Sequence, residues 1–434
     1  MFNISTAYRK LKKSYLKNLP EFLAFRYKLY PEFVFEPSPK TRKDEIPVFT
    51  FHSVEPNRFE EQLRFLAKNR YQTLTADHFY ECIIGDKHVP ERAIVLTFDD
   101  GWGSLWGVAY PLLKKYGFRA VSFLIPGLIS EVNSYYPNLD DFWNGRETLE
   151  EITSRELSPE PLCTWQEIQK MHESGVIDFQ SHTMYHCLIF TSPAIEDFIH
   201  PSFDFYLKNY NVPIFRNNGT ENISRETELG MPIYTNEPRF SSKKRYFDDE
   251  KLRKRCIEYV KDNGGVGFFK KLNWRKKLID IVEDYRKKYG EAGHFESEEE
   301  QGESFYKDLK ESKCIIENKL GGKVVSHLCY PWWVGSNLSV EISKKAGYLT
   351  NFWGIVEERR TKNRTGDDPY KIGRLLSDEY IFRLPGEGRK PLLKIIKEKF
   401  LLNYKGLIKR LLQPDHPIFI EKRKWAIKGK HIFS

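Results

Sequence analysis

Short apolar runs alternate with amphipathic segments along most of this chain. The apolar runs that predict strands lie at residues 46–52, 93–98, 120–125, 176–179, 324–330, 348–352 and 370–372. Between them, apolar residues recur every three or four positions, which predicts helices at residues 58–69, 105–116, 165–174, 304–319 and 340–346. Strands that alternate with helices are typical of a parallel sheet covered by helices. The pattern therefore predicts an α/β fold, with a barrel as the favoured architecture.

The pattern weakens at residues 190–303, where charged residues, Asn and Pro are frequent. We interpret this segment as a long insertion with helical pieces near residues 249–263 and 274–288. The rest of the chain is predicted to divide into three parts, a basic segment and linker at 1–45, a barrel at 46–385 that contains the insertion, and a basic amphipathic tail at 386–434.

Composition supports a folded chain with reduced cysteines. The 434 residues are 40% hydrophobic and 15% aromatic, which is enough apolar material for a sizeable core. The six cysteines contain no Cys-x-x-Cys pair, and this argues against a zinc ribbon or a disulfide scaffold. We expect free, buried thiols in a reducing compartment.

The net charge of +9 is concentrated at the two ends of the chain. Residues 1–43 carry +7 and residues 386–434 carry +9, so the part between them is acidic at −7. A nucleic-acid enzyme would instead carry a basic stripe beside its site. The distribution of charge therefore argues against a nucleic-acid partner.

Chemically useful residues follow four of the predicted strands. Asp99–Asp100 follow the strand at 93–98, and His182 and His186 follow the strand at 176–179. His52 ends the first strand, and residues 329–333 end a later one. In parallel α/β folds the carboxyl ends of the strands carry the catalytic groups. One carboxylate and two imidazoles are enough to hold a divalent metal, which leaves the second carboxylate to act as a base.

Each of these pieces also has a structural explanation. An Asp-Asp-Gly sequence at the end of a strand commonly forms a turn, because Asp caps the turn and Gly accepts a positive φ. A His-x-x-x-His pair is commonly two surface histidines. The combination at two strand ends favours the metal site over both alternatives.

Two of these segments resemble a known family. Thr97–Gly101 and Ser181–His186 are similar to the first two motifs of the polysaccharide deacetylases, the NodB-homology group of carbohydrate esterase family 4. The similarity covers about residues 46–190 and 304–384. It implies a distorted (β/α) barrel with about seven parallel strands, to which this chain adds the long insertion and the basic helical ends.

The resemblance also implies roles for the motif residues. Asp100, His182 and His186 would bind the metal, and Asp99 would be the general base. This ligand set suits zinc or another first-row divalent ion, with open positions for water and substrate. The metal would lower the pKa of a bound water and polarise the acetamide carbonyl.

The chain departs from the common pattern of the family in two places. It has no late Leu-x-His motif for the catalytic acid, and Cys329 stands near the position of the Arg in the usual third motif. These departures match a circularly permuted sub-group in which His52 would be the acid. Arg374 would replace the missing Arg and orient Asp99. The alternatives are a histidine that ends a strand and a surface arginine.

Aromatic residues near the motifs are candidates for the binding of a sugar ring. We expect Trp102, Tyr330, Pro331 and Trp332 to contact the substrate, although core packing explains an aromatic residue equally well.

The predicted function is that of a metal-dependent hydrolase that removes N-acetyl groups from a saccharide or polysaccharide. The first rival is an O-deacetylase or another C–N hydrolase, such as a cyclic-amide hydrolase, on the same scaffold. The second rival is a carbohydrate-binding protein that keeps the fold without turnover. If His52 lies on the same face as Asp99, an acid–base pair exists and the catalytic reading is favoured.

The basic ends raise the hypothesis of attachment to an anionic membrane surface. Residues 391–413 and 8–30 have apolar residues at helical spacing with lysines between them, and no segment has the length of a membrane span or the pattern of a secretory signal. We therefore expect a cytoplasmic protein. For the tail, a C-terminal helix packed on the barrel is favoured over the membrane surface.

Flotation with anionic liposomes tests this attachment. The full chain is expected to float with the vesicles, and a chain without residues 386–434 is expected to bind them less, because each basic residue near an anionic surface adds attraction. Equal flotation of the two chains would contradict the role of the tail.

Overall fold

The protein was analysed as a computed structural model, which describes residues 19, 22–38, 44–158, 160–203, 205, 209–291, 293–356 and 362–399. The chain forms two compact units. The first contains Asp308–Val334 and the described residues before Tyr185 and after Ile342. The second contains Tyr185–Lys307 and Gly335–Ile342 among the described residues.

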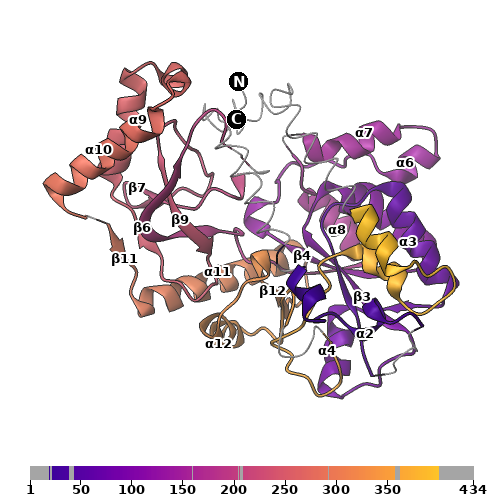
Figure 1. Cartoon of the computed structure of the whole chain (residues 1–434). Helices are drawn as coiled ribbons and strands as arrows, with labels where there is room; N and C mark the ends of the chain where they lie inside the picture. The colour runs from indigo at the N-terminus through magenta and orange to yellow at the C-terminus, as the bar shows by residue number, and fades with distance from the viewer. Residues whose placement is uncertain are drawn as a thin grey trace. The chain divides into compact units, whose positions relative to one another are not determined.

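The first unit is built on a parallel sheet of seven strands (Figure 1). The strands are β1 (Val48–Phe51), β2 (Gln72–Thr73), β3 (Ala93–Asp100), β4 (Ala120–Leu124), β5 (Ile177–Ser181), β12 (His327–Cys329) and β13 (Thr350–Phe352). Six of them follow the order β1-β3-β4-β5-β12-β13, and β2 pairs with the beginning of β3. All of these pairs are parallel.

A short segment at residues 372–375 closes this sheet into a barrel. Ile372 forms a parallel bridge with Phe352 of β13, and Leu375 forms a parallel bridge with Phe49 of β1. The N–H of Leu375 donates to Val48 O at 2.8 Å, and the N–H of Thr50 donates to Leu375 O at 3.2 Å. The two edge strands are therefore joined through residues 372–375.

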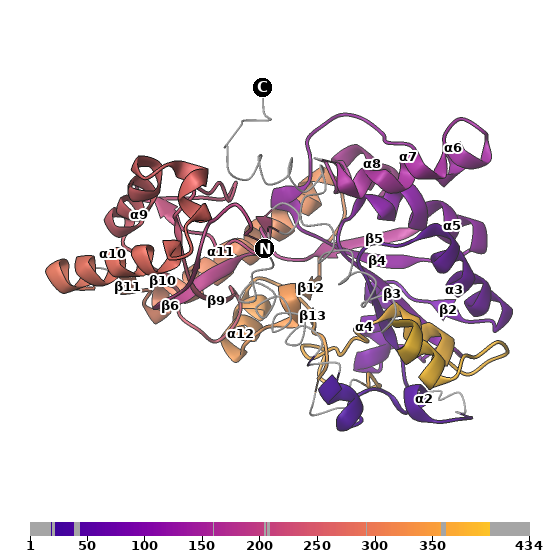
Figure 2. The same cartoon turned by 45° about the horizontal axis from the view of Figure 1, so that its top comes forward.

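Helices lie around the strands of the barrel (Figure 2). Those that belong to the first unit are α2 (Glu32–Phe35), α3 (Pro56–Lys68), α4 (Ala76–Ile84), α5 (Tyr110–Tyr116), α6 (Leu139–Trp143), α7 (Leu149–Ser154) and α8 (Trp165–Glu173). Two further helices, α11 (Glu298–Lys319) and α12 (Asn337–Lys345), each contribute residues to both units. Local sequence fixes their starts. The Glu55 side chain accepts the N–H groups of Asn57 and Arg58 at the start of α3, and Thr164 and Glu167 form a capping box at the start of α8.

The core of the first unit lies where the strands face α4 and one another. Its buried residues include Val48, Val95, Phe123 and Phe352, each fully buried. All eight residues of β3 are buried, as the continuous apolar run predicts for a central parallel strand. This burial fixes the position of Asp99 and Asp100, the last two residues of β3.

The second unit contains an antiparallel pair of long strands and two helices. Its elements are β6 (Leu188–Phe198), β7 (Arg216–Asn217), β8 (Thr220–Glu221), β9 (Pro232–Pro238), β10 (Tyr246–Phe247), α9 (Glu250–Asp262), α10 (Trp274–Tyr289) and β11 (His294–Phe295). Strand β6 pairs with β9 through a register that shifts twice. Aromatic residues such as Phe190, Tyr234 and Tyr246 fill one core, and α9 and α10 enclose a second.

The predicted fold class, a distorted (β/α) barrel of parallel strands, is confirmed. The predicted helix at 105–116 begins as a π-helical turn at Leu105–Ala109, and the predicted strand at 324–330 is shorter, at His327–Cys329. The predicted helices near 249–263 and 274–288 correspond to α9 and α10. The shifted β6–β9 pair was not predicted, because its residues show no regular alternation.

Most of the two basic ends lies outside the described residues. Residues 392–399 are helical, within the predicted helix at 391–413. None of the helices that the structure describes is both long and apolar enough to span a bilayer.

Candidate active site

The sheet register brings the predicted site residues to one level at the carboxyl edge of the barrel. Asp100 is the partner of Leu124 in β4, and Leu124 is in turn the partner of Ser181 in β5. Ser181 is the partner of Leu328 in β12. The residues that follow these positions therefore leave the sheet side by side.

Asp99 forms a buried, bidentate ion pair with Arg374. The two terminal nitrogens of Arg374 donate to the two carboxylate oxygens at 2.7 and 2.9 Å, and both side chains are at most 1% exposed. Arg374 also donates to the carbonyl of Trp353 and to the hydroxyl of Thr97. The closing segment of the barrel thus supplies the partner of Asp99.

Arg374 keeps Asp99 ionised. Burial opposes ionisation of the Asp99 carboxyl, but the charge and hydrogen bonds of Arg374 outweigh burial and hold its pKa well below the usual range. The carboxylate is therefore ionised at neutral pH.

Asp100 is held by its backbone and by Trp102. Its φ of 71° and the φ of 80° at Gly101 turn the chain sharply at the end of β3. A Cβ on Gly101 would lie 2.9 Å from a methyl carbon of Leu124, so a side chain has no room there. The indole N–H of Trp102 donates to one Asp100 oxygen at 3.0 Å. These contacts fix the direction of the carboxylate.

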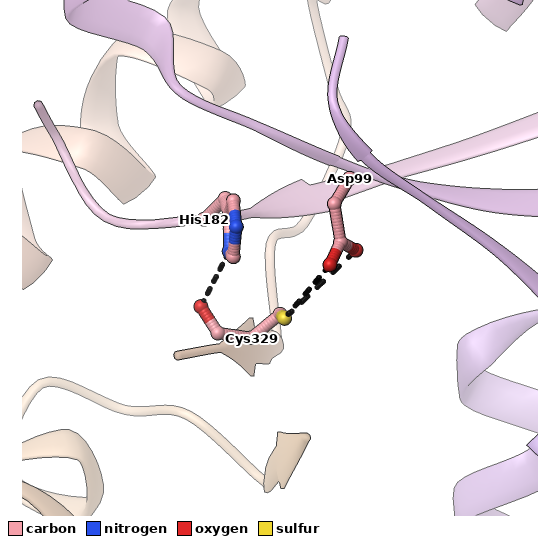
Figure 3. Close-up of side chains that lie close together, drawn as sticks. All are labelled: Asp99, His182 and Cys329. Atoms are coloured by element: carbon pink, nitrogen blue, oxygen red, sulfur yellow. Dashed lines mark hydrogen bonds between the residues drawn. The ribbon is translucent and has the colours of Figure 1, made fainter. Parts of the chain in front are cut away.

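His182 is oriented by the backbone of β12. Its Nδ1 is 2.8 Å from the carbonyl oxygen of Cys329, which can only accept, so Nδ1 carries the proton (Figure 3). Its Nε2 keeps a lone pair and lies 3.4 Å from an Asp100 oxygen. Burial lowers the pKa of His182, which favours the neutral imidazole. This is the arrangement of a metal-binding histidine whose second nitrogen is held by a carbonyl.

The three predicted ligands fit a divalent cation. One ligand atom from each of Asp100, His182 and His186 lies within 4.8 Å of the others, and all three residues are buried. The Ser181–His186 segment turns through positive φ angles at Thr183 and His186 instead of forming a helix. A carboxylate oxygen and imidazole nitrogens are a donor set for zinc and other first-row ions.

Cys329 is a buried residue of the site, and its contact with Asp99 was not predicted. Its thiol is 3.9 Å from both Asp99 oxygens and donates toward them (Figure 3). Burial raises the pKa of the thiol, so it stays protonated. The sequence marked Cys329 only by its place near a missing Arg.

His52 lies on the same face as Asp99. Its Nε2 is 4.0 Å from an Asp99 oxygen, and its side chain is 45% exposed. The ring stands edge-on to Trp333, with 6.4 Å between the ring centres. Trp333 itself lies against Gly354, where an added Cβ would approach the Trp333 Cβ to 2.9 Å. Neither Trp333 nor Gly354 was predicted as a support for His52.

The predicted sugar-binding aromatics fall into two groups. Trp102 and Tyr330 are at most 2% exposed, and Tyr330 accepts a hydrogen bond from Asn351 through its hydroxyl. This differs from the predicted stacking role, because a buried ring offers no free face. Pro331 is buried as well, whereas Trp332 is partly exposed and has a positive φ of 56°. Such backbone strain is common at ligand sites.

Part of this chain is similar to known polysaccharide deacetylases. Residues 86–201 match the family model for polysaccharide deacetylases. YxkH of Bacillus subtilis strain 168 is 36% identical over 95 residues, which are 20% of this chain and 34% of YxkH. The poly-beta-1,6-N-acetyl-D-glucosamine N-deacetylase of Escherichia coli K12 is 30% identical over 141 residues, which are 32% of this chain and 19% of that protein.

The chain thus spans about a third or less of the length of these relatives. Among solved structures, a de-N-acetylase from Aggregatibacter actinomycetemcomitans aligns with 82% of this chain and 99% of its own, with a TM-score of 0.47 and 18% identity. The family match contains Asp99, Asp100, His182 and His186 within its bounds. Residues 86–201 of this chain are therefore similar to polysaccharide deacetylases.

Proposed function

We propose that this protein hydrolyses the N-acetyl groups of a saccharide or polysaccharide. One observation carries the proposal. A carboxylate that Arg374 holds ionised lies at the same strand edge as the Asp100 and His182 ligands, and it is 4.0 Å from His52. Base, metal ligands and acid are the groups that amide hydrolysis by water requires.

The relatives support the choice of substrate. The matched Escherichia coli protein is named as an N-deacetylase of poly-beta-1,6-N-acetyl-D-glucosamine. This chain covers only 19% of that protein. We therefore transfer to this chain only the substrate class, an N-acetylated glycan, and not the beta-1,6 linkage.

Asp100, His182 and His186 would hold the metal. A zinc or other first-row divalent ion supplies Lewis-acid activation of water and of the acetamide carbonyl when it is bound. Hydrogen bonds with neighbouring groups orient two of these ligands. Trp102 holds Asp100 through its indole N–H, and the Cys329 carbonyl holds the tautomer of His182.

Asp99 would accept the proton of the attacking water. Because Arg374 lowers its pKa, Asp99 is always ionised but is a weak base. A weak base needs an acidified water as its partner. The bidentate contact also fixes the plane of the carboxylate, so Arg374 acts by positioning and the proton transfer belongs to Asp99.

His52 would donate a proton to the leaving amine. It is the partly exposed group of the site, so its ring can meet the sugar nitrogen, whereas Asp99 and His182 are buried. Trp333 limits its ring orientation. Trp332 follows β12 and offers a partly exposed aromatic ring for the sugar. Trp102, Tyr330 and Pro331 are buried and would support the site by packing.

Acetate release from a panel of acetylated sugars tests the proposed function. We expect release from N-acetylglucosamine oligosaccharides, loss of release after chelation, and recovery when a divalent metal is added back. Release from O-acetylated sugars alone would favour an O-deacetylase. Binding of the oligosaccharides without any release would favour the carbohydrate-binding alternative.

Substitutions of Asp99 and His182 distinguish the proposed role of general base from that of metal ligand. Asp99→Asn is expected to keep the metal and to lower kcat by about 10²- to 10⁴-fold, as loss of a general base does. His182→Ala is expected to lose the metal, measured by elemental analysis of the purified protein. Because Asp99→Asn leaves Arg374 without its countercharge, the double variant Asp99→Asn, Arg374→Gln serves as the stability control. Retained activity in Asp99→Asn would refute the base.

His52→Gln tests the acid through the leaving group. Amide hydrolysis is expected to fall by about 10²- to 10⁴-fold, while hydrolysis of an activated acetyl ester is expected to change little, because its leaving group needs no proton. His88→Gln, at an exposed histidine of the same unit, is the matched control. An equal loss on both substrates would assign His52 a structural role.

A further inference from the structure

The second unit contains a cavity of its own. Its volume is about 160 Å³, which is below the roughly 300–1,000 Å³ of sites for drug-sized ligands and therefore suits a single ring. Its lining includes four aromatic residues and two arginines, Phe190, Phe215, Tyr246, Phe247, Arg216 and Arg245. All of these residues belong to the second unit.

A tight hairpin forms one wall of the cavity. Strands β7 and β8 are joined by Asn218 and Gly219, whose φ angles of 49° and 79° are those of a type I′ turn. No atom lies within 4 Å of the place where a Gly219 Cβ would stand. The N–H of Asn218 donates to the carboxylate of Glu250 at the start of α9. The wall is therefore anchored before any ligand binds.

Two guanidinium groups share one carboxylate beside the cavity. Arg245, which is 5% exposed, holds both oxygens of Glu221 at 2.7 and 2.8 Å. Arg216 reaches the same carboxylate only through its Nε, at 3.1 Å. Both guanidinium groups lie over the ring of Phe247, at 4.1 Å for Arg216 and 4.6 Å for Arg245. One positive charge is left in excess.

The acidic groups of the lining are already paired. Asp248 accepts two bonds from Arg253 at 2.9 Å, and Glu250 pairs with Lys254 at 3.0 Å. The charges of Arg216 and His294 also contribute to a lowered pKa of Glu300, but the hydrogen bonds from Ser297 contribute more. The Glu300 carboxylate accepts the N–H of Ser297 and is exposed to water. The excess charge of Arg216 is therefore available to a ligand.

The terminal nitrogens of Arg216 are available to bind an anion. Its two terminal nitrogens make no hydrogen bond to any residue that the structure describes, although its plane is fixed by Phe247 and by the Nε contact. His294 lines the same cavity, and its ring lies 5.1 Å from that of Phe247. A planar guanidinium with both terminal nitrogens available binds carboxylate or phosphate in a bidentate manner.

We propose that this cavity binds one sugar ring that carries a single carboxylate or phosphate. The aromatic walls fit the apolar face of a sugar, and Arg216 fits its anionic group. The choice of a sugar over another anionic ring rests on the proposed function. The insertion would then recognise acidic units of the glycan at a site apart from the residues that carry the hydrolysis.

Ligand-observed NMR with the full chain tests this proposal. The probes are glucuronate, glucose 6-phosphate, glucose, benzoate and inorganic phosphate. Glucuronate or glucose 6-phosphate is expected to bind, and which of them binds more tightly assigns the anionic group. Arg216→Gln is expected to weaken that binding by about 10- to 100-fold, as loss of a charge-assisted hydrogen bond does.

Arg275→Gln is the matched control. Arg275 is also stacked on an aromatic ring, that of Trp274, and paired with a carboxylate, that of Asp197, but it does not line the cavity. Binding that survives Arg275→Gln and Asp99→Asn but not Arg216→Gln supports the proposal, whether or not the chain releases acetate. Equal binding by glucose, or binding that Asp99→Asn abolishes and Arg216→Gln leaves intact, would overturn it. Binding of benzoate or phosphate alone would overturn the assignment to a sugar.

Discussion

The buried ion pair between Asp99 and Arg374 is the constraint on which the site depends. Two charges that are almost fully removed from water persist only because each satisfies the other with two short hydrogen bonds. Removal of one partner from such a pair costs about 3–5 kcal/mol. The pair joins the end of the central strand β3 to the segment that closes the barrel, so the same contact keeps Asp99 ionised and ties the closing segment to the centre of the sheet.

The remaining groups of the site take their positions from backbone atoms at strand ends. The carbonyl of Cys329 in β12 selects the tautomer of His182, and the carbonyl of Trp353 fixes Arg374. Cys329 ends β12 and Trp353 directly follows β13, so the pairing of these strands fixes the positions of both carbonyls. His52 differs from these groups, because it is partly exposed and is bounded by the ring of Trp333.

The sequence predicted those parts of the site that lie within short motifs. Asp99, Asp100, His182 and His186 follow strands whose apolar runs are plain, so their position at one edge could be inferred. Contacts between distant segments could not. Trp102 was expected to face a sugar, but it forms a bridge with Leu162 and is covered by that segment. The thiol of Cys329 faces Asp99 only because of the register of β12, and the shifted pairing of β6 and β9 has no regular pattern to reveal it.

The closure of the barrel by residues 372–375 has a consequence for the order in which the protein is made. Asp99 and Arg374 are 275 positions apart in the chain. During synthesis from the N-terminus, β3 exists long before its partner emerges, and until then a buried Asp99 has no countercharge. A nascent chain therefore cannot hold the ionised Asp99 in its final place. The candidate site is completed only when nearly the whole barrel has left the ribosome, although its motifs are translated in the first half of the chain.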